Sequence, residues 1–199
     1  MNGIRAFLKK KDNWESYVQT EDPDIICLNE TKISEGDVDA LGDVFPGLPH
    51  VQWHFSTAKK GYSGTAIFSK QAPQHVLKGF HPSVKAPADN EGRVLTARFT
   101  HFTLIATYVP NSGLQLDRLS YRTEKWDSYL KKHLDAIGRE NPKLPLILCG
   151  DLNVAHRDMD VTDPKKKRNK VECLCFLPLV LSVILLSSLS HRSYAAFLI

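Results

Sequence analysis

Cysteine is scarce in this sequence, and the few cysteines do not have the spacing of a disulfide framework. The 199 residues contain four: Cys27, Cys149, Cys173 and Cys175. The first two lie inside apolar runs, where a free thiol packs as a small hydrophobic group. The other two form a CxC pair without the further ligands that a zinc site needs. We therefore expect a reducing compartment, no disulfide-stabilised core and no structural zinc.

The chain also lacks a recognisable leader, an internal repeat and a strong charge of one sign. The opening MNGIRAFLKKKDNW has no apolar segment of the kind found in secretory signals. The net charge is +4 with a pI near 8.8, which is compatible with a polyanionic partner but does not identify one. With 42% hydrophobic residues, the chain is long enough for one domain with a sizeable core.

One long apolar run stands apart from the rest of the sequence. It covers residues 173–190 and follows the basic cluster KKKRNK. As a helix it would span about 27 Å, slightly less than the ~30 Å hydrocarbon core, so a tail anchor is one interpretation. We favour another, in which residues 171–199 are an unrelated, misread or alternatively spliced end without membrane association. The abrupt change in composition then places the domain at residues 1–170.

The remaining sequence alternates between short strands and helices. Apolar or alternating runs predict strands at 24–30, 50–56 and 64–70, two strands within 92–110 that bend near Thr100, and a last strand at 143–151. Helical spacing of apolar residues predicts helices over 13–21 and 116–139. This order indicates a layered α/β fold with sheets inside and helices outside.

Acidic and amide side chains follow several of these strands at their carboxyl ends. Glu30 ends one strand, Tyr108 and Asn111 end another, and Asp151 and Asn153 end the last. Residues i and i+2 share a face of a strand, and sites gather at such strand ends in open sheets. Glu30 and Asp151 are oxygen ligands suited to Mg²⁺, and Asp151 could instead act as a general base toward water.

The neutral members of this set complement the two carboxylates. The amides of Asn111 and Asn153 and the phenol of Tyr108 can donate to a phosphate oxygen or orient a nucleophile without adding negative charge. Together with a metal, such donors stabilise charge on phosphorus-bound oxygens. The set predicts phosphodiester hydrolysis. A purely structural interpretation also exists, in which Glu30 pairs with Lys32 at the surface and Tyr108 is an ordinary strand aromatic.

Seven motifs occur in the order found in exonuclease III-type apurinic/apyrimidinic (AP) endonucleases, of the endonuclease/exonuclease/phosphatase superfamily: NGIRA, LNETK, KKGYSGTAIFSK, GRVLTARF, TYVPNSG, RLSYRTEKWD and GDLNVAHRDMD. The resemblance covers about residues 1–170. It implies a four-layer α/β sandwich, with two central mixed sheets flanked by helices and an incomplete second half. It also implies Mg²⁺-dependent (alternatively Mn²⁺-dependent) cleavage of double-stranded DNA 5′ to an abasic site in base-excision repair, with 3′ exonuclease or phosphodiesterase activity in many members.

The resemblance also implies roles for individual residues. Glu30 resembles the metal-binding glutamate, and Tyr108 the active-site tyrosine. Asp151 resembles the acid that activates water and is sometimes assigned to the metal. Asn153 resembles its partner, which orients the nucleophile beside the metal. Asn111 resembles the amide that contacts the target phosphate.

Four further residues are weaker candidates. Asn2 matches the second polar residue of the opening motif and is a candidate metal neighbour. Lys59 and Lys60 are candidates for binding DNA. Together with Arg93 they could contact backbone phosphates, which would make binding depend on salt, or merely solvate turns.

The chain departs from the family pattern in three places. It begins inside the opening motif, and Asn29 stands where glutamine is usual. Beyond Lys170 no Ser-Asp-His motif follows, because His191 lies in LSHRS without the aspartate. A histidine and its carboxylate contribute several orders of magnitude in rate. We therefore expect this chain to be weakened or inactive.

Two other functional classes stay open at this point. A phosphatase or phospholipase of the same superfamily is one, although KKGYSG and YVPNSG are typical of the DNA-repair branch. A non-enzymatic truncated isoform that binds DNA or partners is the other. The run PKKKRNK predicts nuclear import, and hence a nuclear protein, or a DNA-facing loop. No obligate protein partner is indicated.

Overall fold

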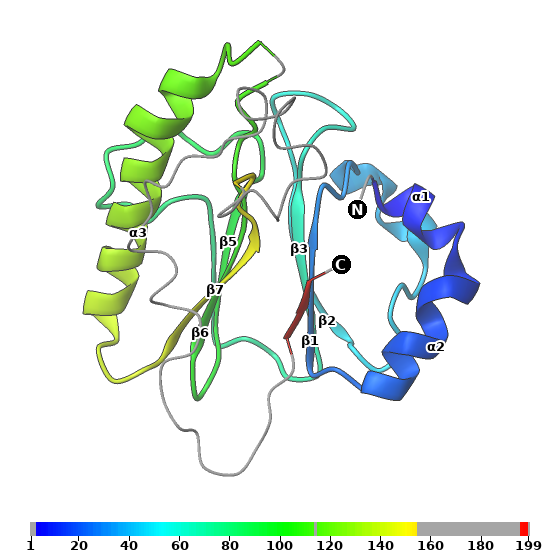
Figure 1. Cartoon of the computed structure of the whole chain (residues 1–199). Helices are drawn as coiled ribbons and strands as arrows, with labels where there is room; N and C mark the ends of the chain where they lie inside the picture. The colour runs from blue at the N-terminus through cyan, green and yellow to red at the C-terminus, as the bar shows by residue number, and fades with distance from the viewer. Residues whose placement is uncertain (1–2, 114, 155–195, 199) are drawn as a thin grey trace.

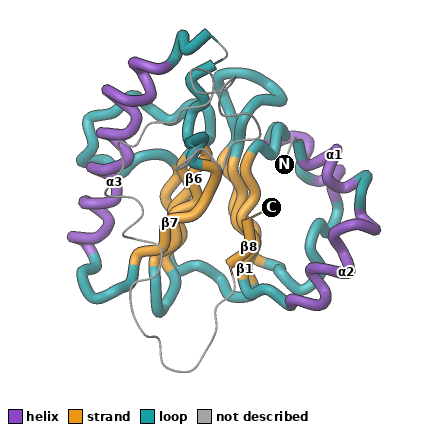
Figure 2. Tube along the Cα trace, in the orientation of Figure 1, coloured by secondary structure: helices purple, strands orange, loops and turns teal. Residues whose placement is uncertain are grey.

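The chain folds into four layers, as predicted from its sequence. The computed structural model describes residues 3–113, 115–154 and 196–198. Helices α1 (Ile4–Leu8) and α2 (Lys11–Glu21) lie outside one sheet, and α3 (Asp127–Glu140) lies outside the other (Figure 1). Figure 2 shows the strands of the two sheets face to face between these helices. Two short 3₁₀ turns, η1 (Glu35–Asp37) and η2 (Asp39–Leu41), and a π-helical turn, η3 (Tyr121–Trp126), complete the helical elements described.

Both sheets are mixed. The first has the order β2-β3-β1-β8, with β2 at His50–His54, β3 at Thr65–Ser69, β1 at Ile25–Asn29 and β8 at Ala196–Leu198. In it β1 pairs antiparallel with β3 and parallel with β8. The second has the order β4-β5-β6-β7, with β4 at His75–Lys78, β5 at Val94–Arg98, β6 at Thr103–Tyr108 and β7 at Leu146–Asp151. In it only β6 and β7 are parallel.

Three elements were not predicted from the sequence. Helix α1 is only five residues long, too short for a helical period to show, and β4 is a four-residue strand with exposed ends. Strand β8 lies in the apolar tail. The expected domain boundary near residue 170 and the run 173–190 lie outside the described residues. Within the part of the chain that is described, no helix is long and apolar enough to cross a membrane.

Alternation along the strands sorts the core into separate layers. In β1, Ile26 and Leu28 pack under α1 and α2, whereas Ile25 and Cys27 face the second sheet. A third apolar cluster joins the second sheet to α3. Cys27 Sγ lies 3.6 Å from Cys149 Sγ across the two sheets, and both are free thiols. The hydrogen bond between them and burial raise the pKa of Cys27 well above its usual value.

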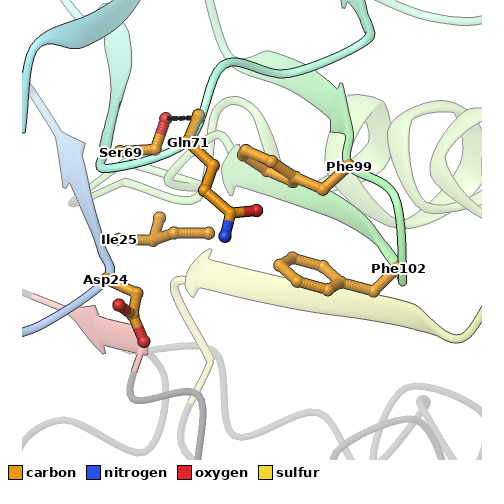
Figure 3. A pocket seen from close by; sticks show the side chains of 6 residues that line it. All are labelled: Asp24, Ile25, Ser69, Gln71, Phe99 and Phe102. Carbon is orange, nitrogen blue, oxygen red and sulfur yellow. Dashed lines mark hydrogen bonds between the residues drawn. The ribbon is translucent and has the colours of Figure 1, made fainter.

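The end of the sandwich where β1 begins is closed by aromatic side chains. A small cavity of about 20 Å³ lies there, lined by Asp24, Ile25, Ser69, Gln71, Phe99 and Phe102 (Figure 3). A volume of this size holds about one water molecule. Because β1 begins at Ile25 and ends at Asn29, this cavity lies at the opposite end of the strand from Glu30.

His133 anchors α3 to the second sheet in its neutral form. Its side chain is fully buried, its Nδ1 accepts from the backbone N–H of His81 (2.9 Å), and its Nε2 lies 3.0 Å from Thr96 Oγ1. Since Nδ1 is an acceptor, the ring proton resides on Nε2 and is donated to Thr96. Burial, reinforced by the nearby charge of His81, lowers the pKa of His133 to about 4, whereas Glu140 opposes this shift.

This histidine should make the fold sensitive to acid. Its pKa falls from 6.5 to about 4 on folding, so the unfolded chain binds a proton more readily below pH 6.5. We expect a loss of about 3 kcal/mol in the free energy of unfolding as the pH drops from 6.5 to 4. Urea unfolding across this range should show a shallower pH dependence for His133→Gln. The exposed control His101→Gln should keep the wild-type slope, and an unchanged slope in His133→Gln would contradict the assignment.

Candidate active site

The polar strand ends of the two sheets meet at one end of the sandwich. Tyr108 and Asp151 are the last residues of the neighbouring parallel strands β6 and β7 and are partners in the register. Glu30 directly follows β1 in the other sheet. The Tyr108 hydroxyl donates to Glu30 Oε1 at 2.5 Å. The predicted carboxylates therefore lie on either side of Tyr108, at a mouth that both sheets form.

The two predicted asparagines form the adjoining part of this mouth. Asn111 Nδ2 donates to Asn153 Oδ1 (3.0 Å), and Asn153 Nδ2 donates to the carbonyl of Val109 (2.8 Å). The backbone N–H of Asn153 donates to Asp151 Oδ1 (2.9 Å). Asn153 takes a positive φ of 48°, which asparagine tolerates better than most residues. The turn after β7 thus fixes the Asp151 carboxylate next to two amides.

Glu30 contacts both Tyr108 and Lys32, so the functional and the structural interpretation of this residue are each partly realised. Its backbone φ is 59°, and about a quarter of its side chain is exposed. Its Oε1 lies 3.6 Å from the Lys32 ammonium as well as accepting from Tyr108. The pairing with Lys32 therefore exists, but it does not remove Glu30 from the site.

Arg93 lies beneath Tyr108 and not at the surface. Its side chain is only 2% exposed, and its guanidinium lies 4.6 Å from the centre of the Tyr108 ring. It donates to the Tyr108 carbonyl (3.1 Å), to the Tyr62 hydroxyl (2.9 Å) and to Glu91. The expectation that Arg93 contacts DNA phosphates or solvates a turn is therefore wrong, because its donors are used inside the protein.

Sequence reasoning missed the residues that complete this support. Arg118 donates to the Tyr62 hydroxyl (3.2 Å) and approaches both carboxylate oxygens of Glu91 (3.4 Å). Two arginines thus share one glutamate and one tyrosine directly behind the site. Tyr62, Arg118 and the pair of Glu91 and Arg93 lie in three separate loops, so no local sequence pattern indicated that they meet.

Tyr108 is held as a proton donor. Burial, and then its hydrogen bond to the Glu30 carboxylate, raise the pKa of Tyr108 well above that of a free phenol, although Arg93 opposes the shift. The nearby charge of Asp151 raises it further. At neutral pH this phenol therefore remains protonated and can donate a hydrogen bond, but it does not act as a base.

The other predicted residues lie at the edge of the site or outside the described part. Lys59 and Lys60 are exposed on the turn between β2 and β3, and Tyr62, later in the same turn, contacts Arg93. Asn2 lies outside the described residues. Among the residues that are described, no group of three or more His, Cys, Asp or Glu side chains could hold a metal ion.

The donor set nevertheless fits a magnesium ion. Glu30 and Asp151 supply carboxylate oxygens, and Asn153 supplies an amide at the same mouth. Mg²⁺ keeps several of its waters and is usually held by one or two carboxylates together with substrate phosphates. A site with two carboxylates is sufficient for this cation, whereas a zinc site would need more nitrogen or sulfur ligands.

The sequence of this chain is similar to one protein family and to individual nucleases. The model of the endonuclease/exonuclease/phosphatase family matches residues 1–192. The exodeoxyribonuclease of Bacillus subtilis (strain 168) is 44% identical over 169 residues, covering 85% of this chain and 62% of that protein. The DNA repair nuclease APEX1 of Danio rerio is 43% identical over 168 residues, covering 84% and 51%. The chain thus spans between half and two thirds of the length of these relatives.

A solved structure has a similar fold. The AP endonuclease LMAP from Leishmania major superposes with a TM-score of 0.64 and 32% sequence identity. The match covers 79% of this chain and 54% of that protein.

Proposed function

Because this chain belongs to the endonuclease/exonuclease/phosphatase family and resembles its exonuclease III-type AP endonucleases, we propose that its site hydrolyses the DNA phosphodiester 5′ to an abasic site with Mg²⁺ (or Mn²⁺). A 3′ exonuclease or phosphodiesterase activity is proposed at the same site. The observation that carries this proposal is the meeting of Glu30, Tyr108, Asp151 and Asn153 at one end of the two sheets.

Each residue has a chemical role in this proposal. Glu30, Asp151 and Asn153 would hold the cation, with Asn2 as a further candidate, and the cation would supply positive charge beside the phosphate. Asp151 is exposed, and one of its carboxylate oxygens accepts a hydrogen bond from the backbone N–H of Asn153. The carboxylate is thus held in place and can take a proton from an attacking water. The Asn111 amide would donate to a phosphate oxygen, where negative charge builds up, and the Tyr108 phenol would do so once substrate replaces Glu30 as its acceptor.

Double-stranded DNA with abasic sites is the proposed partner. Lys59 and Lys60 are exposed beside the site and would bind backbone phosphates, so that affinity falls as salt rises. The names of the relatives, an exodeoxyribonuclease and a DNA repair nuclease, support a DNA substrate. A nuclear location is proposed from the run PKKKRNK in the sequence.

Incision of a defined duplex tests this proposal. The substrate carries one tetrahydrofuran analogue of an abasic site and a 5′ label, and the protein is in excess so that slow cleavage is detected. We expect slow formation of a product ending 5′ to the analogue when Mg²⁺ is present, because no Ser-Asp-His motif follows Lys170 and the activity is expected to be weakened, and no product in EDTA. An undamaged duplex of the same sequence is the control. Equal cutting of both duplexes, or no Mg²⁺-dependent product, would contradict the proposal.

A further inference from the structure

One buried amide at the floor of the site has no hydrogen-bond partner. Asn29 is the last residue of β1 and is 4% exposed. Neither its Oδ1 nor its Nδ2 has a partner in the part of the chain that the structure describes. The other buried side chains in the same condition each have one such atom, a hydroxyl or an indole N–H. Among the described residues, Asn29 is the only one with two buried side-chain polar atoms that have no partner.

The strand pattern places this amide under the candidate metal ligands. Cys27 and Cys149 meet across the two sheets with their sulfur atoms 3.6 Å apart. Two residues further along each strand, and on the same face, lie Asn29 in β1 and Asp151 in β7. The next residue after Asn29 is Glu30. The unpaired amide therefore lies level with Asp151 and one residue before Glu30, on the side where the sheets face each other.

A buried amide without a hydrogen-bond partner destabilises the fold unless a ligand binds it. A buried polar group without a partner costs about 1–3 kcal/mol, and Asn29 has two. Its Oδ1 needs a proton donor, but ionised carboxylates are acceptors only, and the nearby Tyr108 hydroxyl is already donated to Glu30. A ligand bound at the mouth would supply the missing donor.

We propose that Asn29 binds the water shell of the divalent cation: its Oδ1 accepts a hydrogen bond from a metal-bound water while Glu30 and Asp151 contact the ion. Mg²⁺ retains several waters when only one or two carboxylates hold it, so such a donor is available. Asn29 is then a positioning residue that acts through the hydrated ion. This inference rests on the proposed function only in requiring a cation at the site.

Substitution with leucine separates this role from a structural one. Leucine has the same branched arrangement of side-chain heavy atoms as asparagine, although it is larger, and it cannot form hydrogen bonds. Calorimetric unfolding in EDTA should show the variant at least as stable as the wild type, because a desolvated amide is removed. Binding of Mn²⁺ as a probe, followed by electron paramagnetic resonance, should weaken about 10- to 100-fold, the usual effect of losing an outer partner of a metal site.

A matched control uses another buried and unpaired polar group. Thr107 Oγ1 is fully buried and has no partner among the described residues, and it lies on the face of β6 opposite to Tyr108. Thr107→Val should leave Mn²⁺ affinity unchanged. A less stable Asn29→Leu in EDTA, unchanged Mn²⁺ affinity in it, or no Mn²⁺ binding by the wild type would each overturn the inference.

The outcome can be told apart from the fate of the proposed activity. A wild-type chain that binds Mn²⁺ through Asn29 but does not cut abasic DNA would leave this inference standing and remove the nuclease proposal. If the wild type cuts abasic DNA while Asn29→Leu binds Mn²⁺ normally, the nuclease proposal stands and this inference fails.

Discussion

Asp151→Asn should lower the rate of abasic-site incision by about 10²- to 10⁴-fold, the usual contribution of a general base, without unfolding the chain. The amide oxygen of the new side chain can still accept from the Asn153 backbone N–H, which contacts Asp151 Oδ1 at 2.9 Å. The side chain is exposed, so its packing changes little. What is lost is the negative charge that would take up a proton or hold the cation.

A second aspartate controls for the loss of charge itself. Asp135 lies on the exposed face of α3 and pairs with Lys131 at 2.7 Å. Asp135→Asn removes the same charge far from the strand ends, and surface pairs of this kind contribute little. Single-turnover rates on the tetrahydrofuran duplex should therefore match the wild type for Asp135→Asn. Equal rates for Asp151→Asn and the wild type would remove Asp151 from the chemistry.

Arg93→Leu should lower the free energy of unfolding by about 3 kcal/mol. The guanidinium is 2% exposed, and it binds Glu91, Tyr62 and the carbonyl of Tyr108. Removing one partner of a buried ion pair usually costs 3–5 kcal/mol, because the other charge is left behind. About a quarter of Glu91 is exposed and Arg118 remains close to it, which places the expected loss at the lower end of that range.

Urea unfolding followed by tryptophan fluorescence measures this loss. Arg98, at the other end of β5 and only partly buried, provides the control, and Arg98→Leu should cost about 1 kcal/mol or less. Similar losses for the two variants would show that the Arg93 cluster contributes no more than an ordinary surface arginine.

Most of the fold followed from the sequence because strand alternation and helical spacing are local signals. The strand at β1 and the pair β5 and β6 were expected at nearly their observed positions, including the bend near Thr100. Elements of one turn or four residues, such as α1 and β4, are too short to contain a period and were missed. The tail strand β8 is defined by its pairing with β1. Nothing in the short sequence of β8 indicates this pairing.

The candidate site was predictable in its residues but not in its support. Functional sites recur at the carboxyl ends of strands. Glu30, Tyr108 and Asp151 lie at such ends, so the local sequence pattern was enough to predict their positions. Arg93 was wrongly expected at the surface, because burial of an arginine depends on partners distant in sequence, such as Tyr62. The unpaired amide of Asn29 likewise becomes visible only when the two sheets are packed together.

The hydrogen bond from Tyr108 to Glu30 joins residues of different sheets. The site therefore depends on tight packing between the sheets, which partly unfolded forms of the chain lose. No backbone ladder of the described strands runs from one sheet to the other, so the sheets are joined by side chains and by a few backbone hydrogen bonds between loops, such as the one from the Gly64 N–H to the Glu91 carbonyl (3.3 Å). A swollen, molten-globule-like form would keep its ladders, and so its far-ultraviolet dichroism, while pulling Glu30 away from Tyr108. Ligand recognition would then vanish while both sheets persist, so circular dichroism by itself is a poor guide to competence.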